Sequence, residues 1–192
     1  LRTCTRSHLS SLEGRRGVLA HRGYGMTSLT IDLFPEVPIA DGVFRGVLTP
    51  STKRFDDGLP SAAIVLDAKE PAGGSRLLLS VLATRGGDFG DSLARAQGLF
   101  VVMANPLAGR EDAFRQFYVD RHMGEMLALH GILAGALCRS NGEGPVFVSL
   151  FPVLDCVTAA ASLAAVRGTD RLAPNPEVDR ATSRPGFYDR WK

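Results

Sequence analysis

A tyrosine and a histidine four residues apart are the strongest candidates for chemistry in this chain. Tyr118 and His122 belong to a segment in which steps of four residues also carry Phe114 and Met126. Residues four apart in an α-helix lie on one face, one above the other. The spacing therefore predicts a helical row in which an imidazole and a phenol are surrounded by aromatic and thioether side chains.

Two interpretations of this row remain open. In the first, His122 is a general base or acid in a small-molecule pocket, because imidazole titrates near neutral pH, and the Tyr118 hydroxyl orients it or holds a substrate oxygen. Phe114, Phe117 and Met126 are then the substrate-binding residues. In the second, His122 is a neutral core residue with satisfied hydrogen bonds, as is usual for buried polar groups.

Other polar residues are weaker candidates. Glu125 could orient the His122 imidazole, pair with Arg121 or be solvated. Arg139 and Arg184 could bind an acidic substrate, although arginines near strand ends are mostly exposed. No set of His, Cys, Asp and Glu has the spacing of metal ligands, and no serine lies in a nucleophile elbow, so we predict no metal site.

The elements expected around the row follow the order strand, helix, strand, strand, helix, strand. An apolar run ended by Asn105-Pro106 is the first strand, and the helix that carries the row starts near Gly109. The predicted strands are 98–104, 132–139, 146–153 and 181–191, and the second helix is 157–166 with Asp155 as its N-cap. This order is ferredoxin-like, so the predicted fold class is α+β.

The first half of the chain has a different pattern. Four strands and no convincing helix are predicted there, at 28–34, 43–48, 62–66 and 77–82. We expect three parts: a disordered basic tail at 1–25, a β-rich N-terminal extension at 26–97 and the ferredoxin-like domain at 98–192. The tail could be a transit segment, an expression artefact or translated sequence upstream of a start at Met26, and the true start is left open.

Composition excludes several classes of function. Of the 192 residues, 45% are hydrophobic, and the formal charge is only +2. Residues 1–25 carry five Arg and one Glu, so the rest of the chain is faintly acidic and offers no basic face for nucleic acid. No apolar run approaches the roughly 18 residues of a membrane helix. Three cysteines without metal-type spacing indicate a reducing compartment, and we expect a cytoplasmic protein.

The residues around the row also carry a family resemblance. The pattern Asn-Pro-x-x-Gly-Arg-Glu-Asp-x-Phe-x-x-Phe-Tyr-x-x-x-His at 105–122, followed by a strand ending at Arg139, resembles the dimeric α/β-barrel superfamily, in particular its EthD-like members. The resemblance covers residues 98–192. Gly124 and His130 stand where the family often has proline, so the loop and pocket rim are expected to differ.

The resemblance implies a fold, an assembly and a class of activity. The fold is a ferredoxin-like half-barrel that pairs with a second copy into an eight-stranded barrel, which makes a homodimer the expected assembly. The role of the N-terminal extension is open: it could block the dimer, extend the barrel or form its own interface. The family includes cyclases, isomerases, decarboxylases and cofactor-free monooxygenases.

We therefore expect a cofactor-independent enzyme for a hydrophobic, oxygenated aromatic or polyketide-like molecule, working through acid–base chemistry at His122. An enolisable carbonyl compound needs only a base, an oxyanion donor and walls that exclude water. The alternative is a dimer that binds an apolar ligand, haem included, without turnover, or an interaction module.

Overall fold

The computed structural model describes residues 28–34, 43–47, 63–66 and 75–190, and the expected tail at 1–25 lies outside them. The strands are β1 (Ser28–Phe34), β2 (Val43–Val47), β3 (Ala63–Leu66), β4 (Ser75–Arg85), β5 (Gly98–Pro106), β6 (Gly135–Ser140), β7 (Phe147–Val153) and β8 (Val178–Arg190). The helical elements are α1 (Phe89–Arg95), α2 (Glu111–Phe117), the π-helical segment η1 (Tyr118–His122), α3 (Met123–Leu127) and α4 (Cys156–Val166).

The strands form one closed antiparallel barrel in the order β1-β3-β2-β8-β5-β7-β6-β4. Two junctions join the strands of the first half to those of the second. At one, β2 pairs with β8, with Phe44 opposite Arg190; at the other, β4 pairs with β6, with Leu79 opposite Ser140. The barrel is therefore complete within a single chain.

This closure corrects the predicted fold class. The α+β ferredoxin-like dimeric half-barrel with an N-terminal all-β extension is wrong, because β1 to β4 supply half of the barrel themselves. Their apolar side chains, such as Leu29, Ile31 and Leu79, join the core cluster that also contains Leu99 and Val101 of β5. The apolar face that we expected a second copy to cover is thus covered by the same chain. The homodimer stays a prediction, and it needs a different interface.

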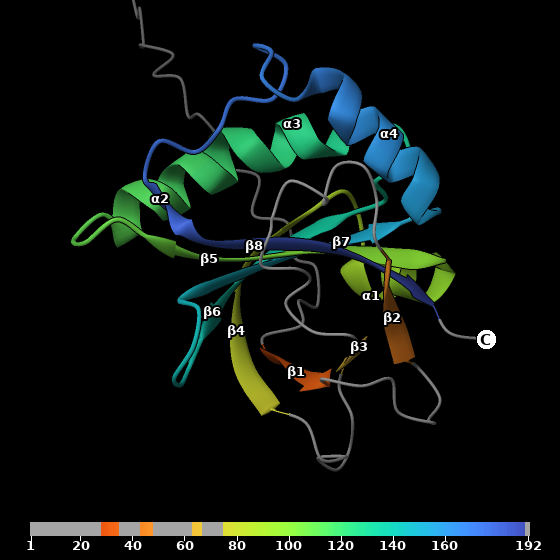
Figure 1. Cartoon of the computed structure of the whole chain (residues 1–192), viewed down its shortest axis with the longest axis horizontal. Coiled ribbons are helices and arrows are strands. Elements are labelled where there is room, and N and C mark those ends of the chain that lie inside the picture. Colours follow the sequence, from red (N-terminus) through yellow and green to blue (C-terminus); the bar gives the residue numbers. More distant parts are fainter. Residues whose placement is uncertain (1–27, 35–42, 48–62, 67–74, 191–192) are drawn as a thin grey trace, which may run out of the picture.

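The two faces of β5 and β7 separate the two halves of the hydrophobic core. Successive strand residues point to opposite faces of a sheet. Leu99 and Val101 accordingly belong to the cluster inside the barrel, whereas Phe100 of β5 and Phe151 of β7 belong to a second cluster outside it. Helices α2, α3 and α4 lie together over this outer face, and α1 lies on another side of the barrel (Figure 1).

Local sequence explains the ends of the helices that form this layer. Gly109, with φ of 71°, makes the turn before α2, a backbone conformation that glycine adopts readily. Glu111 and Asp112 occupy the first turn of α2, where carboxylates interact favourably with the helix dipole. Asp155 caps α4 as predicted, because its side chain accepts a hydrogen bond from the Thr158 amide at 2.7 Å. Within the described residues, no helix has both the length and the apolar character that crossing a bilayer requires.

Candidate functional site

A cavity of about 440 Å³ opens between the helical layer and the outer face of the barrel. Its walls come from the α2–η1–α3 segment, from β5, β7 and β8, and from the connection between α4 and β8. The volume falls within the roughly 300–1,000 Å³ of typical small-molecule sites, and most lining residues are apolar, as in such sites. Among its lining residues are Phe114, Tyr118, His122 and Met126.

The helix that carries Tyr118 and His122 is not a regular α-helix. Between α2 and α3 the backbone widens into a π-helical turn, in which the Met123 amide donates to the Tyr118 carbonyl five residues earlier. Single π-helical turns inside α-helices are frequent at functional sites. This one spans the two candidate catalytic residues, whose ring centroids are 4.8 Å apart.

Tyr118 is buried, and its hydroxyl has no hydrogen-bond partner. The Ser149 hydroxyl on the facing strand lowers the pKa of Tyr118, but the two hydroxyl groups do not have hydrogen-bond geometry. Burial has the larger effect and raises the pKa of Tyr118 far above its ordinary value. The phenol therefore stays protonated at physiological pH and can donate a hydrogen bond to a ligand.

His122 has an 18% exposed side chain, and its buried Nδ1 also has no hydrogen-bond partner. Burial lowers the pKa of His122, and this outweighs the Glu125 charge and the Ala173 backbone, which act in the opposite direction. The imidazole is therefore neutral at pH 7. A neutral imidazole is the form that can accept a proton.

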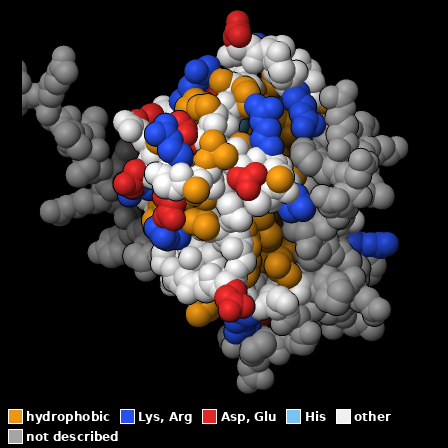
Figure 2. Space-filling view, turned by 60° about the vertical axis from the view of Figure 1, so that its left-hand side comes forward, with side chains coloured by type: hydrophobic (Ala, Val, Ile, Leu, Met, Phe, Trp, Pro, Cys, Tyr) orange, Lys and Arg blue, Asp and Glu red, His pale blue; other side chains and the backbone are white. Residues whose placement is uncertain are grey.

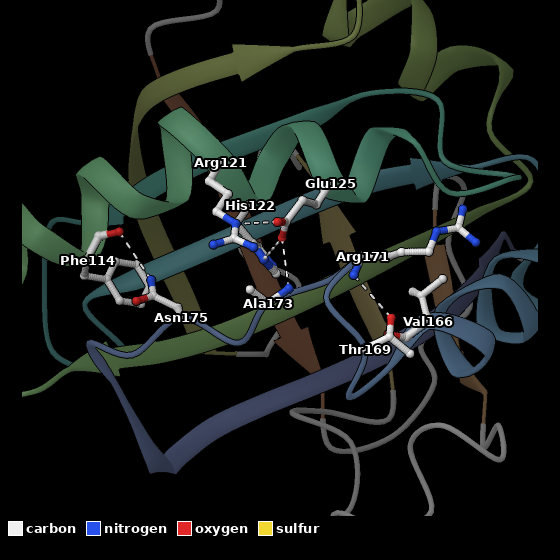
Figure 3. Close-up of polar contacts among 9 residues, drawn as sticks. All are labelled: Phe114, Arg121, His122, Glu125, Val166, Thr169, Arg171, Ala173 and Asn175. Carbon is white, nitrogen blue, oxygen red and sulfur yellow. Dashed lines mark hydrogen bonds and ion pairs between the residues drawn. The ribbon is translucent and has the colours of Figure 1, made fainter.

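Glu125 holds the loop over the cavity and does not orient His122. Its Oε2 lies 3.9 Å from His122 Nδ1, too far for a hydrogen bond, and accepts instead from the Ala173 amide at 3.1 Å. Its Oε1 accepts from Arg121 Nε. Asn175 provides a second anchor by donating to the Phe114 carbonyl at 3.3 Å (Figure 3). The loop is thus attached at two points to the helix that carries the candidate site.

The predicted substrate-binding residues occupy different positions. Phe114 and Met126 are buried and line the cavity, and the Phe114 ring stacks on Phe147 with centroids 4.6 Å apart. Phe117 is not among the lining residues. Its ring lies 6.4 Å from the His122 ring, with the Arg121 guanidinium 5.8 Å from its centroid.

Two arginines at the cavity were not predicted. Arg167, which follows α4, and Arg180, on β8, both line it. The arginines considered from the sequence lie elsewhere, because Arg139 pairs with Glu111 at 2.9 Å and Arg184 donates to the carbonyl of Ala181. Figure 2 shows basic side chains next to a hollow with hydrophobic side chains on one side of the molecule. Arg167 and Arg180 are 45 and 58 residues from His122 in the sequence, so no local pattern connects them with it.

Metal ligation has no geometric basis in the part of the chain that the structure describes, where no group of three or more His, Cys, Asp or Glu could hold an ion. Cys138 and Cys156 are buried free thiols, and burial raises the pKa of Cys138 to about 12. Neither thiol lines the cavity.

No protein-family model and no curated protein sequence matches the chain. Among solved structures it resembles a major regulator of staphylococcal pathogenesis, with 9% identity and a TM-score of 0.51 over 87% of this chain and 100% of that chain. It is also similar to an anthrone oxidase-like protein, with 11% identity and a TM-score of 0.48 over 86% of this chain and 91% of that chain. Identities this low show the fold alone, and the similarity to the second structure is too weak to support any conclusion.

The resemblance deduced from the sequence is therefore supported only at the level of the fold. A barrel with helices packed on one outer face is α/β-barrel-like, whereas the ferredoxin-like description is corrected by the closure of the barrel within one chain. Membership in the EthD-like group stays a prediction.

Proposed function

We propose that this protein is a cofactor-independent enzyme that moves a proton on a hydrophobic, oxygenated aromatic or polyketide-like small molecule. The observation that carries the proposal is the pair of buried polar groups without partners, Tyr118 Oη and His122 Nδ1, on residues that line one cavity. Buried polar atoms usually have partners, and unsatisfied ones need an explanation. A ligand that supplies the missing interactions is such an explanation.

Their protonation states assign different roles to the two residues. His122 is neutral because burial lowers its pKa, so it is the base that accepts a proton from carbon. Tyr118 keeps its proton because burial raises its pKa, so it is the donor to an oxyanion and cannot be the base. Groups with opposite shifts in one site are a recurring way to separate these two roles.

The simplest reaction for these groups starts at a carbon next to a carbonyl. His122 takes the proton from that carbon, the electron pair moves into the carbonyl, and the enolate oxygen accepts a hydrogen bond from Tyr118. Return of the proton from the imidazolium to another position of the enolate completes an isomerisation and leaves the enzyme unchanged. Cyclisation follows if the enolate carbon attacks a second carbonyl of the same molecule and the alkoxide formed takes the proton back from the imidazolium. Phe114 and Met126 form apolar walls of the cavity in which these steps take place.

A binding protein without turnover is the second candidate. The observation that favours it is the apolar lining, in which Phe100 stacks on Phe187 with centroids 4.4 Å apart and Phe114 stacks on Phe147. Aromatic side chains of this kind would hold a flat ligand with or without a reaction. The two candidates differ in one measurable respect, because only the enzyme transfers a proton.

Proton exchange on a small ketone separates them. 2-Tetralone is an apolar bicyclic ketone with enolisable protons, and exchange of these protons in D₂O can be followed by NMR. We expect the native protein to accelerate exchange and His122→Gln to reduce the acceleration by roughly 10²–10⁴-fold, the usual range for a lost acid–base group. Tyr118→Phe should reduce it by up to about 10²-fold through the lost donor.

His130 offers a matched control. It is exposed at the end of the same helical region and does not line the cavity, so His130→Gln should exchange the ketone as the native protein does. If 2-tetralone binds but exchanges at the same rate with native protein and His122→Gln, the protein is a binder and the proposed catalysis is wrong.

A further inference from the structure

The charged residues that line the cavity are all of one sign. Apart from His122, which is neutral, they are Arg167 and Arg180, and the lining contains no Asp or Glu. Both arginines are exposed, whereas Tyr118 is buried. From this polarity we propose that the ligand is an amphipathic acid, with an apolar ring system within the cavity and an anionic group at its mouth bound by Arg167 and Arg180. The inference names the substrate class for the function proposed above and rests on that proposal.

The buried aromatic part of the lining explains why such a ligand would have a defined orientation. The cavity surfaces of β5, β7 and β8 include Phe100, Phe147 and Phe187, all buried, and these rings offer no partner to an anion. Burying an ionised group there without a partner would be costly. An anionic group is therefore directed to the arginines, and the other end of the molecule is directed towards Tyr118 and His122.

Three acidic side chains near the cavity wall make contacts of their own. Glu177 makes two hydrogen bonds with Arg110, at 2.7 and 2.8 Å, and Asp179, next to Arg180, accepts from the Ala181 amide at 3.1 Å. Glu125 is held by Arg121 and the Ala173 amide. A guanidinium presents a planar fork of donors that matches a carboxylate or sulfonate, so an acid group on a ligand is chemically complementary to the lining arginines.

Two fluorescent probes with the same ring system test this preference. 8-Anilinonaphthalene-1-sulfonate carries a negative charge, and N-phenyl-1-naphthylamine lacks the sulfonate. We expect the native protein to bind the anionic probe more tightly. Arg180→Gln and Arg167→Gln should each weaken its binding by about two- to fivefold, and the double variant by about tenfold, because solvent partly screens exposed charges. Affinity for the neutral probe should stay within about twofold, and the preference should decrease as salt is raised.

Three controls make the result decisive. Arg171→Gln removes a charge from the same loop at a residue that does not line the cavity and should leave both affinities unchanged (Figure 3). Arg180→Lys should restore part of the preference by keeping the charge. Val102→Trp places a large side chain in the cavity and should weaken binding of both probes. Thermal melts of each variant show that the protein is folded.

The outcomes separate this inference from the proposed catalysis, because probe binding requires no turnover. Equal affinity of the native protein for both probes, an unchanged preference in the double arginine variant, or a preference that survives Val102→Trp would each overturn the anionic ligand. A preference that depends on the arginines, combined with no exchange of 2-tetralone, would support the ligand class and overturn the catalysis.

Discussion

Removal of one hydroxyl group should stabilise this protein. Tyr118 is only 4% exposed, and its hydroxyl is buried without a hydrogen-bond partner. A buried polar group without a partner costs about 1–3 kcal/mol, so Tyr118→Phe, which keeps the ring and its stacking on Phe114, should raise the free energy of unfolding by about 1 kcal/mol or more. For a chain of this size, 1 kcal/mol corresponds to about 2–4 °C in Tm.

A second hydroxyl gives the matched control. Thr182 Oγ1 accepts from the Asn105 amide at 2.9 Å and donates to the Asp179 carbonyl at 2.8 Å, so Thr182→Val removes a satisfied hydroxyl with little change in shape. We expect it to lower the free energy of unfolding by about 1 kcal/mol or more, since it strands two backbone partners. Thermal melts and urea titrations of both variants give the comparison.

The opposite signs of the two changes are the test. If Tyr118→Phe melts below the native protein by as much as Thr182→Val does, the Tyr118 hydroxyl is bonded within the fold, for example to Ser149. The argument that its missing partner is a ligand would then fail. A stabilised Tyr118→Phe protein that exchanges 2-tetralone more slowly would show that the hydroxyl serves function at the expense of stability.

Two further predictions concern packing and pH. Gly98→Ala should lower the free energy of unfolding by about 1–3 kcal/mol in urea titrations, because a methyl group there would lie 2.5 Å from Cys156 Sγ. Gly142→Ala is the control and should change the free energy of unfolding little, because its added methyl would meet nothing within 4 Å beyond its chain neighbours. Equal effects of the two substitutions would contradict the packing described. Burial lowers the pKa of His122 from 6.5 in the folded protein. Between that lowered value and 6.5 the unfolded chain binds a proton at His122 more readily than the folded protein does, so the free energy of unfolding should fall as the pH decreases through this window. His122→Gln should show a weaker decrease in urea titrations between pH 7.5 and 5, and an identical decrease would mean that other groups cause it.

Part of the cavity lining follows from local spacing in the sequence. Steps of four residues brought Phe114, Tyr118, His122 and Met126 to one face, and all four line the cavity. The π-helical turn was not predictable in this way, because helical periodicity assumes regular i→i+4 hydrogen bonds. Phe117, which looked equivalent to Phe114, lies outside the lining.

The distant part of the site was out of reach of local patterns. Arg167, Arg180 and the loop around Ala173 reach the cavity only because α4 and β8 pack against the same outer face of the barrel. Glu125 was interpreted from its spacing to His122, but a loop 48 residues away provides its backbone partner. Tertiary contacts of this kind depend on the fold as a whole.

The barrel itself shows a similar limit. The alternation of Leu29, Ile31 and Leu33 predicted β1 with its observed bounds, since one face of the strand is buried. The strands with which β1 to β4 would pair were left open, because pairing between β2 and β8 joins residues 140 or more positions apart. The fold class was therefore assigned from the second half alone, and that assignment was wrong.

The pH dependence of 2-tetralone exchange tests the central claim most directly, namely that neutral His122 is the base in the cavity. Because burial lowers the pKa of His122 from 6.5, we predict an exchange rate that falls as the pH decreases, with a midpoint below 6.5, and His122→Gln should lack this pH-dependent acceleration. A rate that declines with a midpoint above 6.5, or a profile that His122→Gln reproduces, would contradict the account.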